Sequence, residues 1–171
     1  MTFRSRHHYS QAVATPLYTR DILRLASSIP HLGLLDEAEG RSERASAVCG
    51  SRVIVTVRVD DKGRVSALGQ EVRACALGQA SAALMGRAVI GRSGAELAAA
   101  RDALGDFLEG RREDAGDWPD LAELAAARAY PARRASIMLP FEAVAEAALR
   151  AGGQEPPAAA SSSSSPSSSE R

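Results

Sequence analysis

The fold follows from residues 46–88, which read SAVCGSRVIVTVRVDDKGRVSALGQEVRACALGQASAALMGRA. Valine occupies every second position from residue 53 onward in the segment 51–59, and this period of two predicts a β-strand. The next four residues, DDKG, contain the aspartates and the glycine that are typical of a tight turn. A returning antiparallel strand is therefore expected over 64–73, and the alanine-, glycine- and serine-rich run after it predicts a helix over 75–90.

Outside this hairpin the pattern is mainly helical. Apolar residues and end signals predict further helices over 18–28, 95–109, 120–129 and 132–150. Ser93 is expected to cap the second of these, and Pro140 to kink the last one or to mark its true start. Residues 42–48 are expected to add an edge strand. The predicted fold class is α+β, a small antiparallel sheet of about three strands packed against several helices.

The chain of 171 residues fits one domain, which we expect over 1–151. Its residues are 45% hydrophobic but only 4% aromatic, so the core must be aliphatic and rich in alanine. Residues 152–171, GGQEPPAAASSSSSPSSSER, have almost nothing to bury, and this composition predicts a disordered C-terminal tail.

Charge and hydropathy exclude several classes of partner. The 21 basic and 21 acidic residues cancel, which gives no reason to expect binding to nucleic acid or to an anionic membrane. No apolar run reaches the ~18–20 residues that span a bilayer. Residues 1–20 also lack the apolar core of a secretory signal peptide. We therefore expect a cytoplasmic protein whose cysteines stay reduced.

The two cysteines flank the hairpin almost evenly. Cys49 lies about 12 residues before the centre of the turn and Cys75 about 13 after it, so a regular ribbon brings both thiols to one end. Cys75 also opens a helix, whose N-terminal N–H groups favour a thiolate, and we expect it to be the more nucleophilic of the two. Two convergent thiolates form half of a tetrahedral metal site, or an acceptor for sulfur. Ordinary burial of both cysteines is the alternative.

The order of these motifs resembles the IscU/NifU N-terminal family of iron–sulfur cluster assembly scaffolds, including its SUF-type members. That family has Cys-Gly-Asp before the hairpin, Gly-Cys-x-x-x-x-Ala-Ser at the helix start, and Gly-Lys-Ser after the helix. This chain has CGS at 49–51, ACALGQAS at 74–81 and GRS at 91–93. The start YS at 9–10 and the loop IPHLG at 29–33 are also similar to family motifs.

The same comparison shows departures from the family pattern. Cys49 and Cys75 match its first two ligand cysteines, whereas Ser51 stands where the family has aspartate. Ala135 stands at the position of the third cysteine, and Arg134 at a neighbouring position that is a histidine ligand in some members. The resemblance leaves Ser51 as a weak oxygen ligand. Because a [2Fe–2S] cluster normally takes four ligands, it also implies that outside ligands complete the site, that binding is weak, or that the scaffold role is altered.

The resemblance implies a scaffold rather than an enzyme. Through Cys49 and Cys75 it would bind iron or a nascent cluster, most simply a transient [2Fe–2S] cluster, or accept sulfur. The implied partners are a cysteine desulfurase, iron–sulfur acceptor proteins and a second copy of the chain in a homodimer. Two alternatives stay open: a degenerate scaffold that binds no cluster and serves as an interaction or regulatory partner of the assembly machinery, and a two-cysteine zinc or redox protein.

Overall fold

The computed structural model describes residues 16–154. The predicted tail beyond Gln154 and the YS motif at 9–10 lie outside this part of the chain. The elements in chain order are α1 (Arg20–Ala26), β1 (Gly40–Ala45), β2 (Arg52–Val59), β3 (Val65–Arg73), α2 (Ala76–Ala88), α3 (Gly94–Leu108), the 3-10 helices η1 (Leu121–Ala129) and η2 (Pro131–Arg133), and α4 (Arg134–Ala151).

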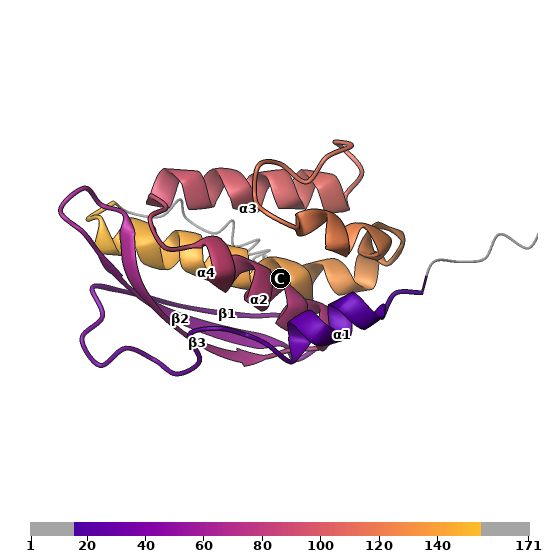
Figure 1. Cartoon of the computed structure of the whole chain (residues 1–171), viewed down its shortest axis with the longest axis horizontal. Helices are drawn as coiled ribbons and strands as arrows, with labels where there is room; N and C mark the ends of the chain where they lie inside the picture. Colours follow the sequence, from indigo (N-terminus) through magenta and orange to yellow (C-terminus); the bar gives the residue numbers. More distant parts are fainter. Residues whose placement is uncertain (1–15, 155–171) are drawn as a thin grey trace, which may run out of the picture.

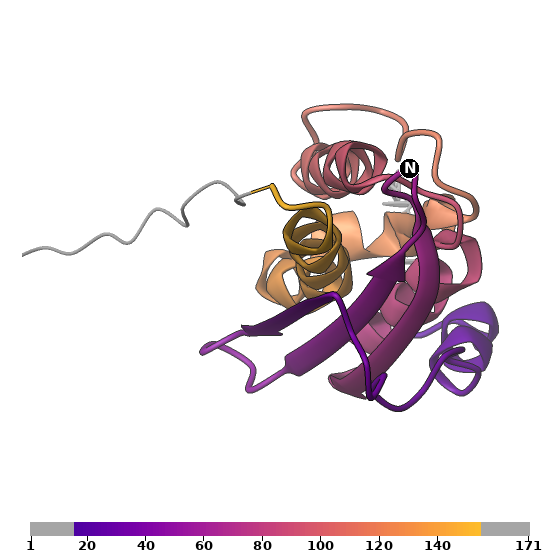
Figure 2. The same cartoon turned by 90° about the vertical axis from the view of Figure 1, so that its left-hand side faces the viewer.

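These elements form layers, with the sheet on one side and the helices on the other (Figure 1). The sheet has the order β1-β2-β3, and α4 lies across its inner face against β1 and β2. α2 lies between α1 and α4, and α3 covers α4 on the side away from the sheet (Figure 2). The predicted α+β class, with a three-stranded antiparallel sheet, is confirmed. Among the described residues, no helix is long and apolar enough to cross a membrane.

The hairpin that the sequence predicts is present as β2 and β3. Its antiparallel register pairs Arg52 with Arg73 at the end remote from the turn. Asp60 organises the turn, because its carboxylate accepts hydrogen bonds from the backbone N–H groups of Lys62 and Arg64, both at 2.9 Å. Val53, Val55 and Val57 of β2 belong to the main core, as their alternation indicates, whereas Val59 at the end of the strand is half-buried and outside it.

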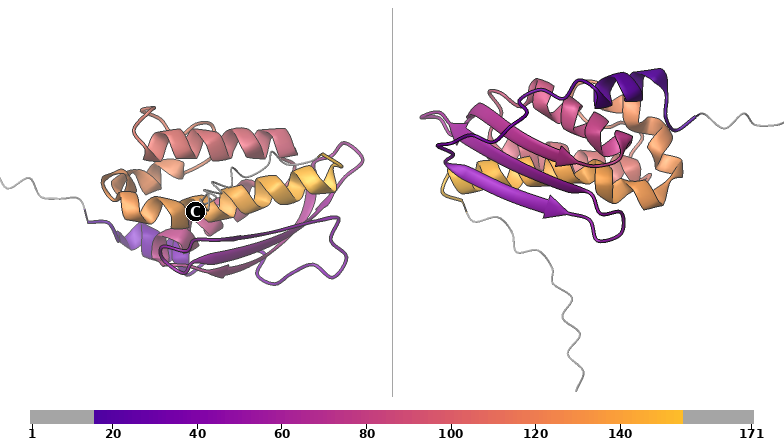
Figure 3. Two further views of the ribbon diagram at one scale, coloured as in Figure 1. Left: turned by 180° about the vertical axis from the view of Figure 1, so that it is seen from behind. Right: turned by 90° about the horizontal axis from the view of Figure 1, so that it is seen from below.

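The outer face of β2 is buried as well. Ile54 and Thr56 point to this face and are only 5% and 2% exposed. The segment between α1 and β1 runs along the β3 side of the sheet (Figure 3), where the N–H of Gly33 donates to the carbonyl of Gln70 at 3.0 Å. The N–H of Leu35 donates to Oγ1 of Thr56 at 2.9 Å. The alternating pattern of β2 cannot indicate that its outer face is buried, because the segment that buries this face lies about 20 residues away along the chain.

The edge strand lies earlier than the sequence predicted. β1 occupies Gly40–Ala45 rather than 42–48, and it pairs antiparallel with β2. The chain leaves the strand at Ser46, because a turn follows in which the N–H of Gly50 donates to the carbonyl of Ser46 at 2.9 Å. This turn carries Cys49 and connects β1 directly to β2.

Three of the predicted helices can be compared with the structure in detail. Ser93 caps α3 as expected, through a capping box in which its hydroxyl accepts from the N–H of Glu96 and the Glu96 carboxylate accepts from the N–H of Ser93. The last helix starts at Arg134 and continues through Pro140, so Pro140 does not mark its start. The predicted helix over 120–129 is a 3-10 helix, η1, and not an α-helix.

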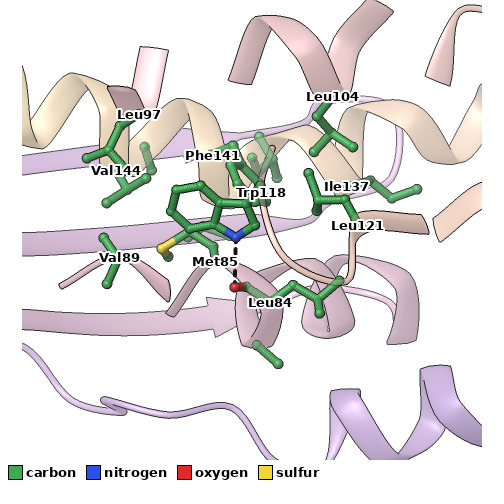
Figure 4. Packing of buried hydrophobic residues seen from close by; sticks show 14 of the residues in the cluster. Leu84, Met85, Val89, Leu97, Leu104, Trp118, Leu121, Ile137, Phe141 and Val144 are labelled. Carbon is green, nitrogen blue, oxygen red and sulfur yellow. Dashed lines mark hydrogen bonds between the residues drawn. The ribbon is translucent and has the colours of Figure 1, made fainter. Parts of the chain in front are cut away.

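Trp118, the only tryptophan of the chain, joins α2 to α4 (Figure 4). Its ring is 5% exposed and meets the ring of Phe141 edge-on, with 5.3 Å between centroids and 79° between planes. The indole Nε1–H donates to the carbonyl of Leu84 at 3.0 Å. The guanidinium of Arg92 lies 5.3 Å from the ring centroid. Trp118 therefore anchors the loop after α3 in the core, together with the smaller buried side chain of Ala115.

Gly40 allows α4 to approach the first residue of β1. A Cβ atom at this position would overlap the carbonyl oxygen of Ala147 and lie 2.9 Å from its carbonyl carbon. We expect Gly40→Ala to lower the free energy of unfolding by about 1–3 kcal/mol, because backbone cannot yield as a flexible side chain does. Urea unfolding followed by circular dichroism measures this loss.

Gly105→Ala is the matched control for Gly40→Ala. A Cβ at Gly105 meets only the terminal methyl of Met138, at an ordinary 3.5 Å. Because Gly105 lies inside α3, we expect alanine there to stabilise the fold by about 0.5–1 kcal/mol. Equal stabilities for the two variants would contradict the close approach of α4 to β1.

Candidate functional site

Both cysteines line one open depression, with a volume of about 440 Å³, at the end of the hairpin remote from its turn. The lining residues come from the turn before β2, the end of β3 and the start of α2: Cys49, Gly50, Ser51, Val72, Arg73, Ala74, Cys75 and Gln79. The convergence expected from the spacing of the two cysteines is therefore present. Cys49 is exposed and Cys75 is half-buried, so neither is sealed in the core.

Antiparallel pairing positions the two thiols. The last paired residues of the ribbon are Arg52 and Arg73, and the cysteines follow just beyond this pair on each strand. On one side, the turn that carries Cys49 is closed by a 2.8 Å hydrogen bond from the N–H of Ser46 to the carbonyl of Ser51. On the other side, Cys75 is the N-cap of α2, and its sulfur makes no capping hydrogen bond.

A chain of hydrogen bonds connects the two sulfur atoms through two hydroxyl groups. The Sγ of Cys49 lies 3.2 Å from the Oγ of Ser51, to which the thiol donates. The Oγ atoms of Ser51 and Ser136 are 3.0 Å apart. The Oγ of Ser136 is in turn 3.3 Å from the Sγ of Cys75. Ser51 and Ser136 are 4% and 0% exposed, so these hydroxyls are held between the thiols and the core.

Close packing of α2 against α4 places Ser136 in this chain. A Cβ on Gly78 would lie 2.5 Å from the Oγ of Ser136, so only glycine leaves room for the hydroxyl. The buried Ser81 hydroxyl donates to the carbonyl of Ile137 at 2.6 Å and ties the same two helices together. The small residues at the start of α2 therefore allow α4 to bring a polar group to the thiols.

Electrostatics favour a thiolate at Cys49. Once the thiol has lost its proton, a hydrogen bond from the hydroxyl of Ser46 has the largest effect on the thiolate. Bonds from the hydroxyl of Ser51, which accepts from the neutral thiol, and from the backbone N–H of Ser51 follow. Partial burial opposes these bonds and the charge of Arg133 assists them, and together they lower the pKa of Cys49 from 9.0 to about 7. From the sequence, the more nucleophilic thiol was expected at Cys75, because this residue opens α2. The structure instead supplies these stabilising groups to Cys49.

The reactivity of Cys49 is expected to follow this lowered pKa. The thiolate is the nucleophile, and it is populated above the pKa and lost below it. Alkylation of Cys49 by iodoacetamide should therefore rise with pH through a midpoint near 7, as measured by mass spectrometry of its peptide. Ser46→Ala should move the midpoint up toward 9.0, because it removes the largest stabilising bond.

Ser27→Ala is the control for this measurement. Its hydroxyl is exposed on the end of α1 and donates to the carbonyl of Arg24 at 2.9 Å, so its removal should leave the Cys49 midpoint unchanged. A wild-type midpoint near 9 would contradict the thiolate stabilisation.

The remaining residues singled out from the sequence lie in or beside this site. Ser51 is part of the hydrogen-bonded chain. Ala135 is exposed in the first turn of α4 and does not line the depression, although its neighbour Ser136 contacts both Ser51 and Cys75. Arg134 donates to the carbonyl of Arg128 at 3.3 Å.

Ser136, the residue after Ala135, was not among the site residues predicted from the sequence. The sequence feature that could have indicated Ser136 is its position on the apolar face of the last helix. Ser136 falls on the same face of α4 as Ile137, Pro140 and Phe141, which are buried, and a polar residue there needs a partner. Across residues 16–154, no three His, Cys, Asp or Glu side chains converge in a way that would hold a metal ion.

Comparison with known proteins gives a consistent result. The family model of the NifU-like N terminal domain matches residues 17–136. The iron–sulfur cluster assembly scaffold protein IscU of Thermotoga maritima is 28% identical over 131 residues, which cover 77% of this chain and 92% of that protein.

Solved structures agree with this match. A NifU-like protein (N-terminal) from Brucella abortus has 37% sequence identity and a TM-score of 0.73, covering 80% of this chain and 95% of that one. A putative iron–sulfur cluster assembly scaffold protein for the SUF system from Fervidobacterium islandicum shares the fold, with a TM-score of 0.71 at 20% identity, covering 77% and 96% of the two chains. The family model spans most of the chain, from α1 through the sheet and both cysteines to the start of α4, and this chain therefore belongs to the family of the NifU-like N-terminal domain.

Proposed function

We propose that this protein is an iron–sulfur cluster assembly scaffold that binds iron or a nascent cluster, or accepts sulfur, through Cys49 and Cys75. The observation that carries the proposal is that both thiols line one open depression and are linked by hydroxyl groups. An exposed thiol with a pKa of about 7 is a competent sulfur acceptor and metal ligand at neutral pH. The iron–sulfur scaffold name of its Thermotoga maritima relative supports an iron–sulfur cargo.

Two thiols supply half of the four ligands that a [2Fe–2S] cluster normally takes. The depression is wide and open, which suits ligands that arrive from outside: a second copy of the chain in a homodimer, a thiol of a partner protein, or glutathione. Sulfur comes from a cysteine desulfurase, and the cluster passes to acceptor proteins. The protein holds and transfers its cargo without turning over a small substrate, and it does so in the cytoplasm, where thiols stay reduced.

Anaerobic reconstitution tests this function. The protein is incubated with ferrous iron, L-cysteine and a cysteine desulfurase, and bound iron, bound sulfide and visible absorbance are measured after gel filtration. We expect iron and sulfide to be retained together with thiolate-to-iron absorbance. Absence of all three, with an unaltered rate of the desulfurase, would contradict the proposal.

One observation favours a second candidate function, a degenerate scaffold that acts only as an interaction partner of the assembly machinery. No third residue of the His, Cys, Asp or Glu type joins the two thiols within residues 16–154. In that case the protein changes the rate of the desulfurase without retaining iron or sulfide. Metal analysis of untagged protein separates both functions from a two-cysteine zinc protein, which would be isolated with zinc.

Ala135→Cys should increase retention of the cluster. The residue does not line the depression, but it is exposed at the start of α4 and is the neighbour of Ser136, which contacts Cys75, so we expect the longer side chain of cysteine to reach the cargo from there. A further ligand should slow cluster loss at least tenfold, since even outer-shell changes alter metal affinity by about 10–100-fold. The half-life of the visible absorbance in the presence of a chelator measures this gain. An unchanged half-life would show that residue 135 does not reach the cargo.

A further inference from the structure

We propose that Ser136 is a positioning residue that holds the two thiols of this site in register for a shared ligand. The inference deepens the proposed function and rests on it, because it concerns the same two cysteines. Ser136 is the only described residue with polar contacts to both sides of the ribbon at this point: its Oγ contacts the hydroxyl of Ser51 at 3.0 Å and the sulfur of Cys75 at 3.3 Å.

The position of Ser136 in the fold gives it this role. It lies in the first turn of α4 and is 0% exposed, so its hydroxyl has no access to bulk water. A buried hydroxyl must find its partners within the protein, and both of its partners belong to the site. Gly78 on α2 leaves the space that this hydroxyl occupies, since a Cβ there would lie 2.5 Å from it. The packing of two helices therefore sets the position of Ser136 independently of the hairpin.

Hydrogen-bond accounting supports the same role when the thiols carry a ligand. Two thiols that bind a metal lose their protons and become acceptors only. Ser51 and Ser136 each carry one hydroxyl proton, which is one donor for each adjacent sulfur. Such bonds to sulfur alter the properties of a metal–thiolate site as well as its geometry. In the unloaded site the Cys49 thiol donates to Ser51, and the two hydroxyls and Cys75 complete the chain that aligns both sulfurs. In the loaded site both hydroxyl protons are used by the thiolates, so Ser136 acts on the cargo through Cys75 and Ser51 acts on it through Cys49.

Cobalt(II) is the probe for this inference, because its thiolate charge-transfer band reports on the bonded sulfur and needs no cluster assembly. Reduced protein is titrated anaerobically with Co²⁺ as wild type, Ser136→Ala and Ser81→Ala. Loss of a hydrogen bond raises the energy of the sulfur lone pair, so Ser136→Ala should shift the band to longer wavelength. It should also weaken binding roughly 2–10-fold, as expected for one net hydrogen bond.

Ser81→Ala is the matched control. Ser81 is equally buried between α2 and α4, but its hydroxyl donates to the carbonyl of Ile137 and touches neither thiol. It should change stability without shifting the band. Ser51→Ala breaks the chain from the side of β2 and should also shift the band, which keeps the test open if Ser136→Ala folds poorly by circular dichroism.

Three results would overturn the inference: an unshifted band in Ser136→Ala and Ser51→Ala, an equal shift in Ser81→Ala, or wild-type protein that binds Co²⁺ without a thiolate band. Failure of the proposed function looks different. In that case the cobalt spectra behave as described, while reconstitution leaves no iron or sulfide on the protein.

Discussion

Trp118→Ala is expected to lower the free energy of unfolding by about 3–5 kcal/mol, the range for truncating a buried large aromatic side chain. The indole is 5% exposed, stacks edge-on against Phe141 and donates to the carbonyl of Leu84 at 3.0 Å. Its removal leaves a cavity between α2 and α4, and the loop after α3 loses its main anchor. Equilibrium unfolding in urea, followed by circular dichroism, measures the loss.

Trp118→Phe separates the ring from its hydrogen bond. Phenylalanine keeps an aromatic ring near Phe141 but has no N–H to donate to Leu84, so its loss should be smaller, with about 1 kcal/mol from the hydrogen bond. The urea concentration at the unfolding midpoint should be lowest for Trp118→Ala, higher for Trp118→Phe and highest for the wild type. A loss below about 1 kcal/mol for Trp118→Ala would show that the ring does not contribute to the core as described.

Serine in place of Cys49 or of Cys75 is expected to lower bound iron and sulfide at least tenfold after reconstitution. The sequence contains only these two cysteines, so either substitution removes half of the thiols that the chain can offer. Serine is similar in size to cysteine, but its hydroxyl does not form the thiolate that binds iron and attacks sulfur donors. Changes outside the ligand shell already reduce metal affinity about 10–100-fold, and loss of a ligand should do at least as much.

Ser81→Ala serves here too as the control that keeps both thiols. It perturbs the packing of α2 on α4 through its bond to the carbonyl of Ile137, so it shows how much of any loss is due to packing alone. We expect it to load iron and sulfide as the wild type does. Full loading of Cys49→Ser and Cys75→Ser would contradict the proposal that these thiols hold the cargo.

Much of the site was predictable because the hairpin and the spacing of its two cysteines depend on residues that are close together in the sequence. The alternating valines, the turn at 60–63 and the spacing of Cys49 and Cys75 predicted a ribbon with both thiols at one end, and the structure has this arrangement. The N-cap at Ser93 was also predicted, and the Glu96 carboxylate that completes its capping box is only three residues away. Periodicity, turn residues and caps act over a few residues, so their outcome depends little on the rest of the fold.

Features that depend on distant segments were not predictable in the same way. The burial of Ile54 and Thr56 comes from the segment before β1. The edge strand was placed two residues late at its start, since Gly40 enters β1 where α4 approaches it. The groups that lower the pKa of Cys49 were not foreseen, because Ser46 and Ser51 lie beside that sulfur in a turn of non-periodic sequence.

The hairpin, the two cysteines and their common end of the ribbon therefore follow from spacing along the chain, since antiparallel pairing converts equal distances from a turn into proximity. The position of the Ser136 hydroxyl between the thiols does not follow from this spacing. Ser136 is 85 residues from Ser51 and 61 from Cys75, and it reaches them because α4 packs closely on the glycine and alanine face of α2. Helix packing of this kind depends on the shape of both surfaces at once, which no local pattern of residues contains.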